Sequence, residues 1–200
     1  MKRVILVILS LLITFTTLGA SEEEVSVKRV LNANYTLQYL SAPRDTDEFL
    51  DIFTEGKFYG RVRSNTFFFK WNVKDTGHSD HLISGLGGSI AYKTAPYQNL
   101  SFDTTFYYTQ AFFDDNDAII PLLKSGKDTF SRYAYYTIGR KNIAVFGQVY
   151  LRYEPIANTN IFLGRQLVET FYTKSNDSKM ITSSFDSIFL DVKSVPNLKA

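Results

Sequence analysis

The sequence contains no cysteine, which excludes a disulfide scaffold, a thiolate metal site, a cysteine nucleophile and a lipid-modified leader. Only two histidines are present, so histidine-based catalysis has few candidate residues. After residue 20 the chain has no run of about 18 consecutive apolar residues, and a helical membrane span is not expected there. If the chain crosses a membrane, it must therefore do so with strands.

Residues 1–20 have the layout of a secretory signal peptide. Lys2 and Arg3 form a positive start, an apolar run extends from Val4 to Phe15, and the small residues Gly19 and Ala20 offer a cleavage site. The segment is too short and wrongly flanked for an ordinary spanning helix. We expect a leader that is cleaved on export, with an uncleaved anchor as the alternative.

The charge balance changes when this leader is removed. The leader holds two of the 22 Lys and Arg residues and none of the 20 Asp and Glu residues, so the rest carries 20 of each. A general nucleic-acid binder normally has a basic excess. Nucleic acid is therefore not expected as a partner.

Aromatic residues are abundant, at 16% of the chain, and they occur in segments with a period of two. Outer-membrane β-barrels place aromatic girdles at both membrane interfaces. A strand crosses such a membrane, when tilted, with about 9–11 residues. We interpret six alternating segments as strands of this kind: 58–71, 86–93, 100–109, 145–154, 161–166 and 188–193.

Short and long connections alternate between these segments. The short turns are 95–98, 155–158 and 195–197, and the long polar links are 74–81, 114–140 and 169–185. Outer-membrane barrels have short periplasmic turns and longer extracellular loops. A soluble β-sandwich, which is the alternative, has no reason to keep this alternation.

The polar sides of the predicted strands carry basic residues. In a water-filled barrel the inward face is polar and the lipid-facing side is apolar. Arg165 follows Gly164 out of phase, so its inward direction requires a bulge, but we include it because it lies close to the others. Asp103 and Glu154 would complete a charged wall. The candidate pore-lining residues are Arg61, Arg63, Arg152, Arg165 and Gln166, with Gln148 on the same side.

Three patches resemble a known family. Residues 53–63 (FTEGKFYGRVR) are similar to the opening strand of the OprD-type outer-membrane porins, which has an F-x-x-G-x-x-x-G-x-x-R pattern. Residues 162–166 (FLGRQ) and 176–180 (NDSKM) resemble that family's G-R-Q strand and the N-D-S-R-[ML] loop that follows it. The resemblance covers about residues 47–200. Lys179 stands where the family usually has arginine, and lysine lacks the planar fork for a bidentate carboxylate contact.

The resemblance implies a wide barrel, of about eighteen strands in that family, through which small solutes diffuse. The family's third extracellular loop folds inward to narrow the pore, and the link 169–185 is the third long link here. Asp177 and Lys179 are thus the expected constriction residues, with the basic side chains named above along the wall. Opposed charges at a constriction create a transverse field and influence ion preference.

We therefore expect an all-β fold, an antiparallel transmembrane β-barrel of the porin type. The chain supplies about six strands and ends where a seventh should begin, which suggests an incomplete N-terminal fragment or a truncated product. The expected organisation is a signal peptide over 1–20, a periplasmic segment over 21–52 and a partial barrel over 53–200. Within the periplasmic segment, residues 21–43 are expected to be loosely ordered and residues 47–53 to form a short helix.

The expected function is a passive channel for small hydrophilic solutes, without catalytic residues, metal or cofactor. Its expected partners are membrane lipid, lipopolysaccharide and the solutes. Assembly into a homotrimer is a further possibility. A complete eight-stranded barrel acting as an adhesin or anchor is one alternative. It would need two further strands, between Asp114 and Tyr136 or before Phe53, and Tyr133–Ile138 is a candidate for part of one. A soluble exported binding protein or enzyme is the other.

Overall fold

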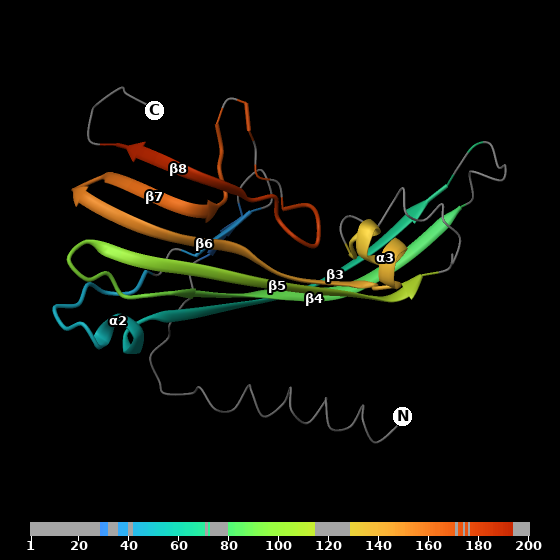
Figure 1. Ribbon diagram of the computed structural model, residues 1–200, viewed down its shortest axis with the longest axis horizontal. Coiled ribbons are helices and arrows are strands. Elements are labelled where there is room, and N and C mark those ends of the chain that lie inside the picture. Colours follow the sequence, from blue (N-terminus) through green and yellow to red (C-terminus); the bar gives the residue numbers. More distant parts are fainter. Residues whose placement is uncertain are drawn as a thin grey trace, which may run out of the picture.

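The computed structural model describes residues 29–31, 36–39, 42–70, 72, 80–114, 129–170, 172–173, 175 and 177–193. The predicted signal peptide, most of the link 74–81 and the turn 195–197 lie outside the described residues. Six long strands form one curled antiparallel sheet, which dominates the structure (Figure 1). The fold is therefore all-β in character, with two short helices beside the sheet.

The strands of this sheet follow one another in chain order. They are β3 (Lys57–Phe69), β4 (His81–Lys93), β5 (Leu100–Asp114), β6 (Asn142–Ile156), β7 (Thr159–Gln166) and β8 (Phe185–Val192). Each strand pairs antiparallel with the next one along the chain, and no crossover occurs. The pairing register shifts at Ser84/Gly85, at Thr105/Phe106 and between Tyr153 and Ile156. The prediction of six antiparallel strands is confirmed.

The two short turns lie at one end of the sheet, together with helix α2 (Figure 1). The turn between β6 and β7 needs a left-handed residue at Asn158, with φ of 63°, which asparagine tolerates better than most residues. Helix α2 spans only Asp51–Thr54, which is shorter than predicted, because residues 47–50 form bends and a turn before it. The backbone N–H of Ala95 donates to the Ile52 carbonyl at 2.9 Å and so ties α2 to the β4–β5 turn.

Residues Tyr133–Ile138 are helical, so this segment does not supply one of the further strands that the eight-stranded alternative needs. Helix α3 (Arg132–Ile138) begins after Ser131, whose hydroxyl accepts a hydrogen bond from the Ala134 N–H at 3.3 Å. It ends at Gly139, which has a left-handed conformation with φ of 65°. These two caps override the strand preference of the aromatic and β-branched residues between them.

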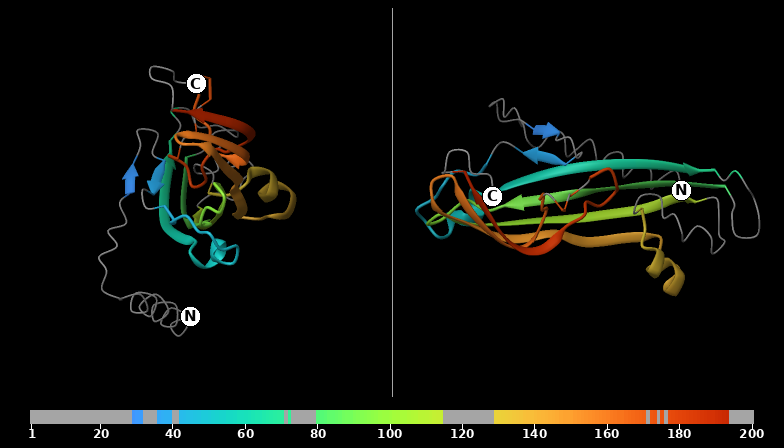
Figure 2. Two further views of the ribbon diagram at one scale, coloured as in Figure 1. Left: turned by 90° about the vertical axis from the view of Figure 1, so that its left-hand side faces the viewer. Right: turned by 90° about the horizontal axis from the view of Figure 1, so that it is seen from above.

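The segment that contains α3 folds back against the sheet near the long-link end. The Phe130 side chain is 1% exposed and packs with Ile83 and Ala111, and Tyr135 packs against this cluster. Gly85 makes room for the segment, because a Cβ atom at this position would overlap the Thr129 side chain. The link between β5 and β6 is thus anchored by Phe130 on this face of the sheet, and α3 lies beside the long-link end of the sheet (Figure 2).

A separate two-stranded sheet precedes the main one. It consists of β1 (Arg29–Leu31) and β2 (Leu37–Tyr39), a region that was predicted to be loosely ordered. That prediction was wrong for these strands because the Tyr39 ring has a partner: it stacks on Tyr59 of β3 with centroids 4.3 Å apart. Neither strand extends the six-stranded sheet.

The two faces of the main sheet differ sharply. We call the face that contacts Phe130 the concave face and the opposite one the outer face. Along β5 every second residue from Ser101 to Ala111 is buried on the concave face. The outer face exposes large apolar side chains, among them Phe58, Val62, Phe68, Leu86, Ile90, Phe146, Leu151, Leu163, Ile188 and Leu190.

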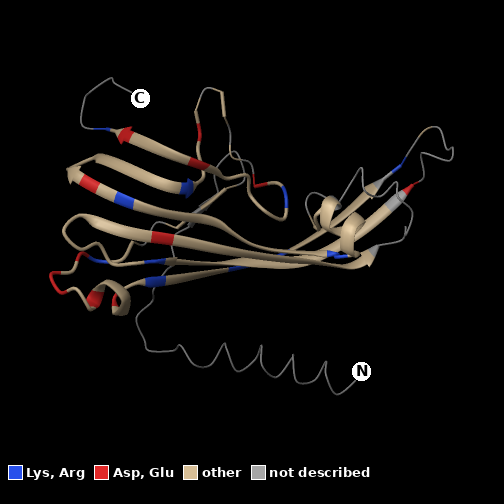
Figure 3. Ribbon diagram, viewed as in Figure 1, with Lys and Arg blue, Asp and Glu red and all other residues tan. Residues whose placement is uncertain are grey.

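Charged residues are scarce on the strands (Figure 3) and are unevenly divided between the faces. Among the strand side chains that the structure describes, those charged on the outer face are Arg165 and Asp186, which bind each other. The others project from the concave face: Lys57, Arg61, Arg63, Lys93, Asp103, Arg152, Glu154 and Asp191. The sheet is therefore apolar outside and polar inside its curl.

Candidate functional site

Arg61 and Arg63 project from β3 on the concave face, because residues two apart on a strand share a face. They are paired in register with Ser89 and Gly87 of β4, which are small and leave the guanidinium groups room. The side chains are 24% and 15% exposed, respectively. Two partly buried positive charges thus lie side by side on the inner wall.

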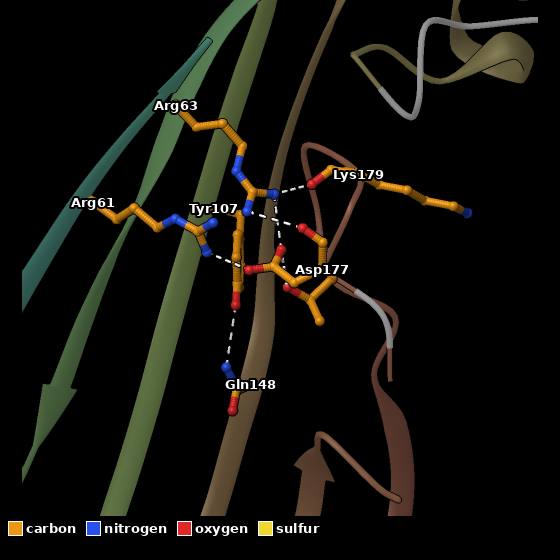
Figure 4. Close-up of polar contacts among 7 residues, drawn as sticks. Arg61, Arg63, Tyr107, Gln148, Asp177 and Lys179 are labelled. Carbon is orange, nitrogen blue, oxygen red and sulfur yellow. Dashed lines mark hydrogen bonds and ion pairs between the residues drawn. The ribbon is translucent and has the colours of Figure 1, made fainter. Parts of the chain in front are cut away.

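The link between β7 and β8 brings Asp177 to these arginines (Figure 4). Arg61 donates to one carboxylate oxygen, and Arg63 donates to the other at 2.8 Å. The Thr182 hydroxyl donates to the same oxygen as Arg63, at 2.7 Å. We call Arg61, Arg63, Asp177 and Thr182 the docking cluster, since it fixes the link on the far wall of the curl.

Arg63 also holds the backbone of the link. Its guanidinium donates to the Asp177 carbonyl at 3.0 Å and to the Lys179 carbonyl. The planar fork of arginine reaches several acceptors in a fixed geometry, which a lysine at this position could not do. The Lys179 side chain itself points away from the cluster (Figure 4). Of the two expected constriction residues, Asp177 thus contributes its carboxylate here and Lys179 its carbonyl.

Asp177 is almost completely covered, with its side chain 3% exposed. Burial raises the pKa of the Asp177 carboxyl, and the hydrogen bonds from Arg61 and Thr182 together with the charge of Arg61 oppose this shift. Arg61, Arg63 and Thr182 together give the buried carboxylate three hydrogen bonds, so the removal of any one of these partners is costly.

The link has an internal structure that presents Asp177. The Ser175 hydroxyl, which is fully buried, accepts from the Val168 N–H at 3.1 Å and lies 3.0 Å from the Ser183 carbonyl. Val168 and Met180 are also buried, at 9% and 3% exposure. Both ends of the link are thus drawn together, and Asp177 projects between them toward β3.

Tyr107 and Gln148 extend the polar wall beside the docking cluster. They come from β5 and β6, and the Gln148 amide donates to the Tyr107 hydroxyl at 3.2 Å (Figure 4). The period-two pattern of β5 places Tyr107 on the polar side and could have identified it. Thr182 gave no comparable signal, because it lies in an irregular link.

Arg152 and Gln166 lie on the concave face, and Gln166 lines the same cavity as Asp177. Arg152 donates one hydrogen bond to the side-chain amide oxygen of Asn160 at 2.7 Å and another to the Glu154 carboxylate at 2.9 Å. Gln166 is 4% exposed and donates to the Ser187 hydroxyl at 3.1 Å. Both residues are held by neighbours on adjacent strands, so they form part of a fixed wall.

Arg165 lies on the outer face, and its expected place among the inward-facing residues is wrong. It pairs in register with Val149 and with Asp186, and its guanidinium binds Asp186 through two bonds of 2.8 and 2.9 Å. The register of β7 with β8 is unbroken from Thr159 to Gln166, so no bulge turns the side chain inward. Gly164 absorbs the local strain instead, with φ of 129°.

The arrangement is a polar wall on the concave face of the sheet. Donors and acceptors of both charge signs line a curved polar surface, and one link crosses from β7 to reach β3. Within the described ranges there is no group of three or more His, Asp or Glu residues that could hold a metal ion. No helix in that part of the chain is long and apolar enough to cross a bilayer.

Comparisons with known proteins give no family assignment: no family model, no curated protein and no solved structure matches this chain.

Proposed function

We propose that this chain forms part of an outer-membrane porin of the OprD type, a passive diffusion channel for small hydrophilic solutes. The observation that carries the proposal is the division of the six-stranded sheet into an apolar outer face and a polar concave face. That division is the reverse of a soluble sheet, whose apolar side would be covered and whose charged side would face water.

The exposed apolar area supports a lipid-facing surface. Soluble monomers rarely expose contiguous apolar patches larger than a few hundred square ångströms. Here Val62 is 82% exposed and Ile188 is 76% exposed, at opposite edges of a sheet that has similar side chains on every strand between them. Hydrocarbon is the solvent that fits such a surface.

The sheet edges define how the channel is completed. Within the described residues, β3 pairs only with β4 and β8 only with β7. In lipid, unpaired backbone groups at a sheet edge are costly, so spanning sheets close into barrels. We propose that further strands complete the barrel around the concave face, with the cleaved leader directing the protein to the outer membrane.

The docking cluster supports the assignment of the β7–β8 link as the constriction. Asp177 binds Arg61 and Arg63 directly on the concave side of the sheet, so the link is held against the inner wall together with its charges. Charged groups that line a pore influence its ion preference. The channel would then select by size and charge, without any catalytic step.

The decisive test is ion conduction by the intact gene product in planar lipid bilayers. Discrete current steps that scale with bulk salt conductivity are expected for a passive pore. Protein that inserts into the bilayer, as shown by protease protection, but carries no ion current would contradict the proposal. A mock purification from cells without the gene controls for contaminating porins.

A further inference from the structure

The concave face encloses a cavity that the proposed channel function does not itself explain. Its volume is about 380 Å³, within the range of small-molecule sites. The main sheet, strand β2 and the β7–β8 link all contribute to its wall, through residues such as Tyr39, Tyr150 and Asp177. The cavity therefore has walls from three parts of the chain and is open on its remaining side.

The charged residues that line this cavity are all paired. Arg61 binds Asp177, Lys93 lies 3.6 Å from Asp103, and Asp191 lies 2.8 Å from Lys193. Asp103 additionally accepts a hydrogen bond from the Tyr150 hydroxyl at 2.7 Å. Because each charge already has a counter-charge, a charged solute would find no unpaired partner here and would lose its own hydration.

One side of the cavity is aromatic. Tyr150, Phe162 and Phe189 come from three consecutive strands, and their ring centroids are 5.9 and 6.2 Å apart in succession. Phe162 and Phe189 are directly opposite each other in the β7–β8 register. The three rings form a row in which neighbouring ring planes are inclined by 64° and 42°, so apolar ring faces and edges lie beside the paired polar groups.

From this combination we infer that the cavity is a binding site for a neutral saccharide. A pyranose ring presents apolar C–H faces that stack on aromatic rings, while its hydroxyl groups both donate and accept hydrogen bonds at the rim. Paired ions such as Lys93 and Asp103 supply donors and acceptors together. Paired charges and an aromatic row fit a neutral, hydroxyl-rich ring better than an ion or an open chain.

The inference rests on the proposed channel function and names the solute class for it. The experiment measures maltose block of the single-channel current of the intact protein, and maltose binding by calorimetry in detergent micelles. Sorbitol is the matched probe because it is neutral and hydroxyl-rich but has no ring face. Arginine and glutamate are the charged probes.

Block and binding by maltose, with at least about tenfold weaker effects of sorbitol, arginine and glutamate, are expected. The double variant Phe162→Ala/Phe189→Ala removes two of the three rings and should raise the dissociation constant for maltose about tenfold. The control variant Leu163→Ala/Ile188→Ala changes the same two strands on the outer face, where Leu163 and Ile188 are also directly paired. It should leave maltose binding unchanged.

Three outcomes would overturn the inference: maltose no better than sorbitol, a charged amino acid better than maltose, or equal losses in the two double variants. Calorimetry keeps this test separate from that of the channel. Maltose binding in micelles without any ion current would contradict the porin proposal and support the saccharide site. Ion current without selective maltose binding would support the porin proposal and contradict the saccharide site.

Discussion

At the scale of single residues, Asp177 decides the electrostatics of the docked link. The isosteric Asp177→Asn variant keeps the size of the side chain but leaves Arg61 and Arg63 with one counter-charge fewer, and it weakens their hold on the link, because both arginines lose a charge-assisted hydrogen bond. A unit charge a few ångströms from the ion path is worth about 1 kcal/mol in water, so we expect a shift toward anions of about fivefold in permeability ratio. The reversal potential in a KCl gradient measures this ratio.

The control for this variant is Asp186→Asn, which removes a charge of the same sign from the outer face. It should leave the reversal potential within error of the native value, because the outer face does not line the ion path. Equal shifts in the two variants, or none in Asp177→Asn, would remove Asp177 from the constriction.

Arg63 is the second residue with a specific prediction, because its fork contacts the Asp177 carboxylate and two carbonyls. Arg63→Lys keeps the charge but loses at least one charge-assisted hydrogen bond, each worth about 1.5–3 kcal/mol. The link should undock more often, and trypsin should cleave the folded protein after Lys179 about tenfold faster. Arg61→Lys is the matched control, since Arg61 hydrogen-bonds only to the carboxylate among the described residues. Similar cleavage rates in both variants would contradict the claim that the Arg63 guanidinium holds the backbone of the link.

At the scale of elements, the β3–β4 pairing depends on one close approach. A Cβ atom at Gly88 would overlap the Arg61 carbonyl oxygen, whereas at Gly60, on the same pair of strands, it would meet nothing within 4 Å. Gly88→Ala should therefore destabilise the folded protein by about 1–3 kcal/mol, the range for overpacking. Gly60→Ala should stay within about 0.5 kcal/mol of the native protein. Urea unfolding in micelles gives both values, and equal stability of the variants would contradict the close approach.

Among the elements, the strands could be predicted from the sequence, whereas the docking of the β7–β8 link and helix α3 could not. The strands follow from the period-two alternation, which is local and therefore visible in segments such as 100–109. The docking of Asp177 on Arg61 joins residues 116 positions apart, and no periodic pattern encodes such a contact. Helix α3 was missed because its caps, Ser131 and Gly139, are weaker sequence signals than its β-prone interior.

Arg165 shows a second limit of prediction from the sequence, which concerns the direction of a side chain. Its basic character suggested a place on the polar wall, but strict alternation from Leu163 puts it on the outer face, where Asp186 of β8 neutralises it. The cross-strand partner was not predictable, because an irregular link separates β7 from β8 and no tight turn fixes their register. The alternation itself was the better guide than residue type.

At the scale of the whole molecule, the two faces of the sheet are the feature that separates a membrane channel from a soluble β-sheet protein. A water-soluble protein would have to cover the outer face with another layer or a partner to avoid association. A barrel in lipid leaves it uncovered and instead places its polar groups around an aqueous interior. The two possibilities predict different costs in stability when an exposed apolar residue of β3 is replaced by a charged one.

Val62→Arg tests this difference directly, since Val62 is 82% exposed and lies near the middle of the 13-residue strand β3. In a bilayer, arginine at the midplane costs about 2–4 kcal/mol, and this cost falls to about 0–1 kcal/mol near the interface. Phe58→Arg, at the short-turn end of the same strand and 74% exposed, is therefore the matched control. Urea titration of protein folded into lipid vesicles should show Val62→Arg as the less stable variant. If the native protein stays folded and monodisperse in buffer without lipid or detergent, and both arginine variants match its stability, the sheet is water-soluble and the porin proposal fails.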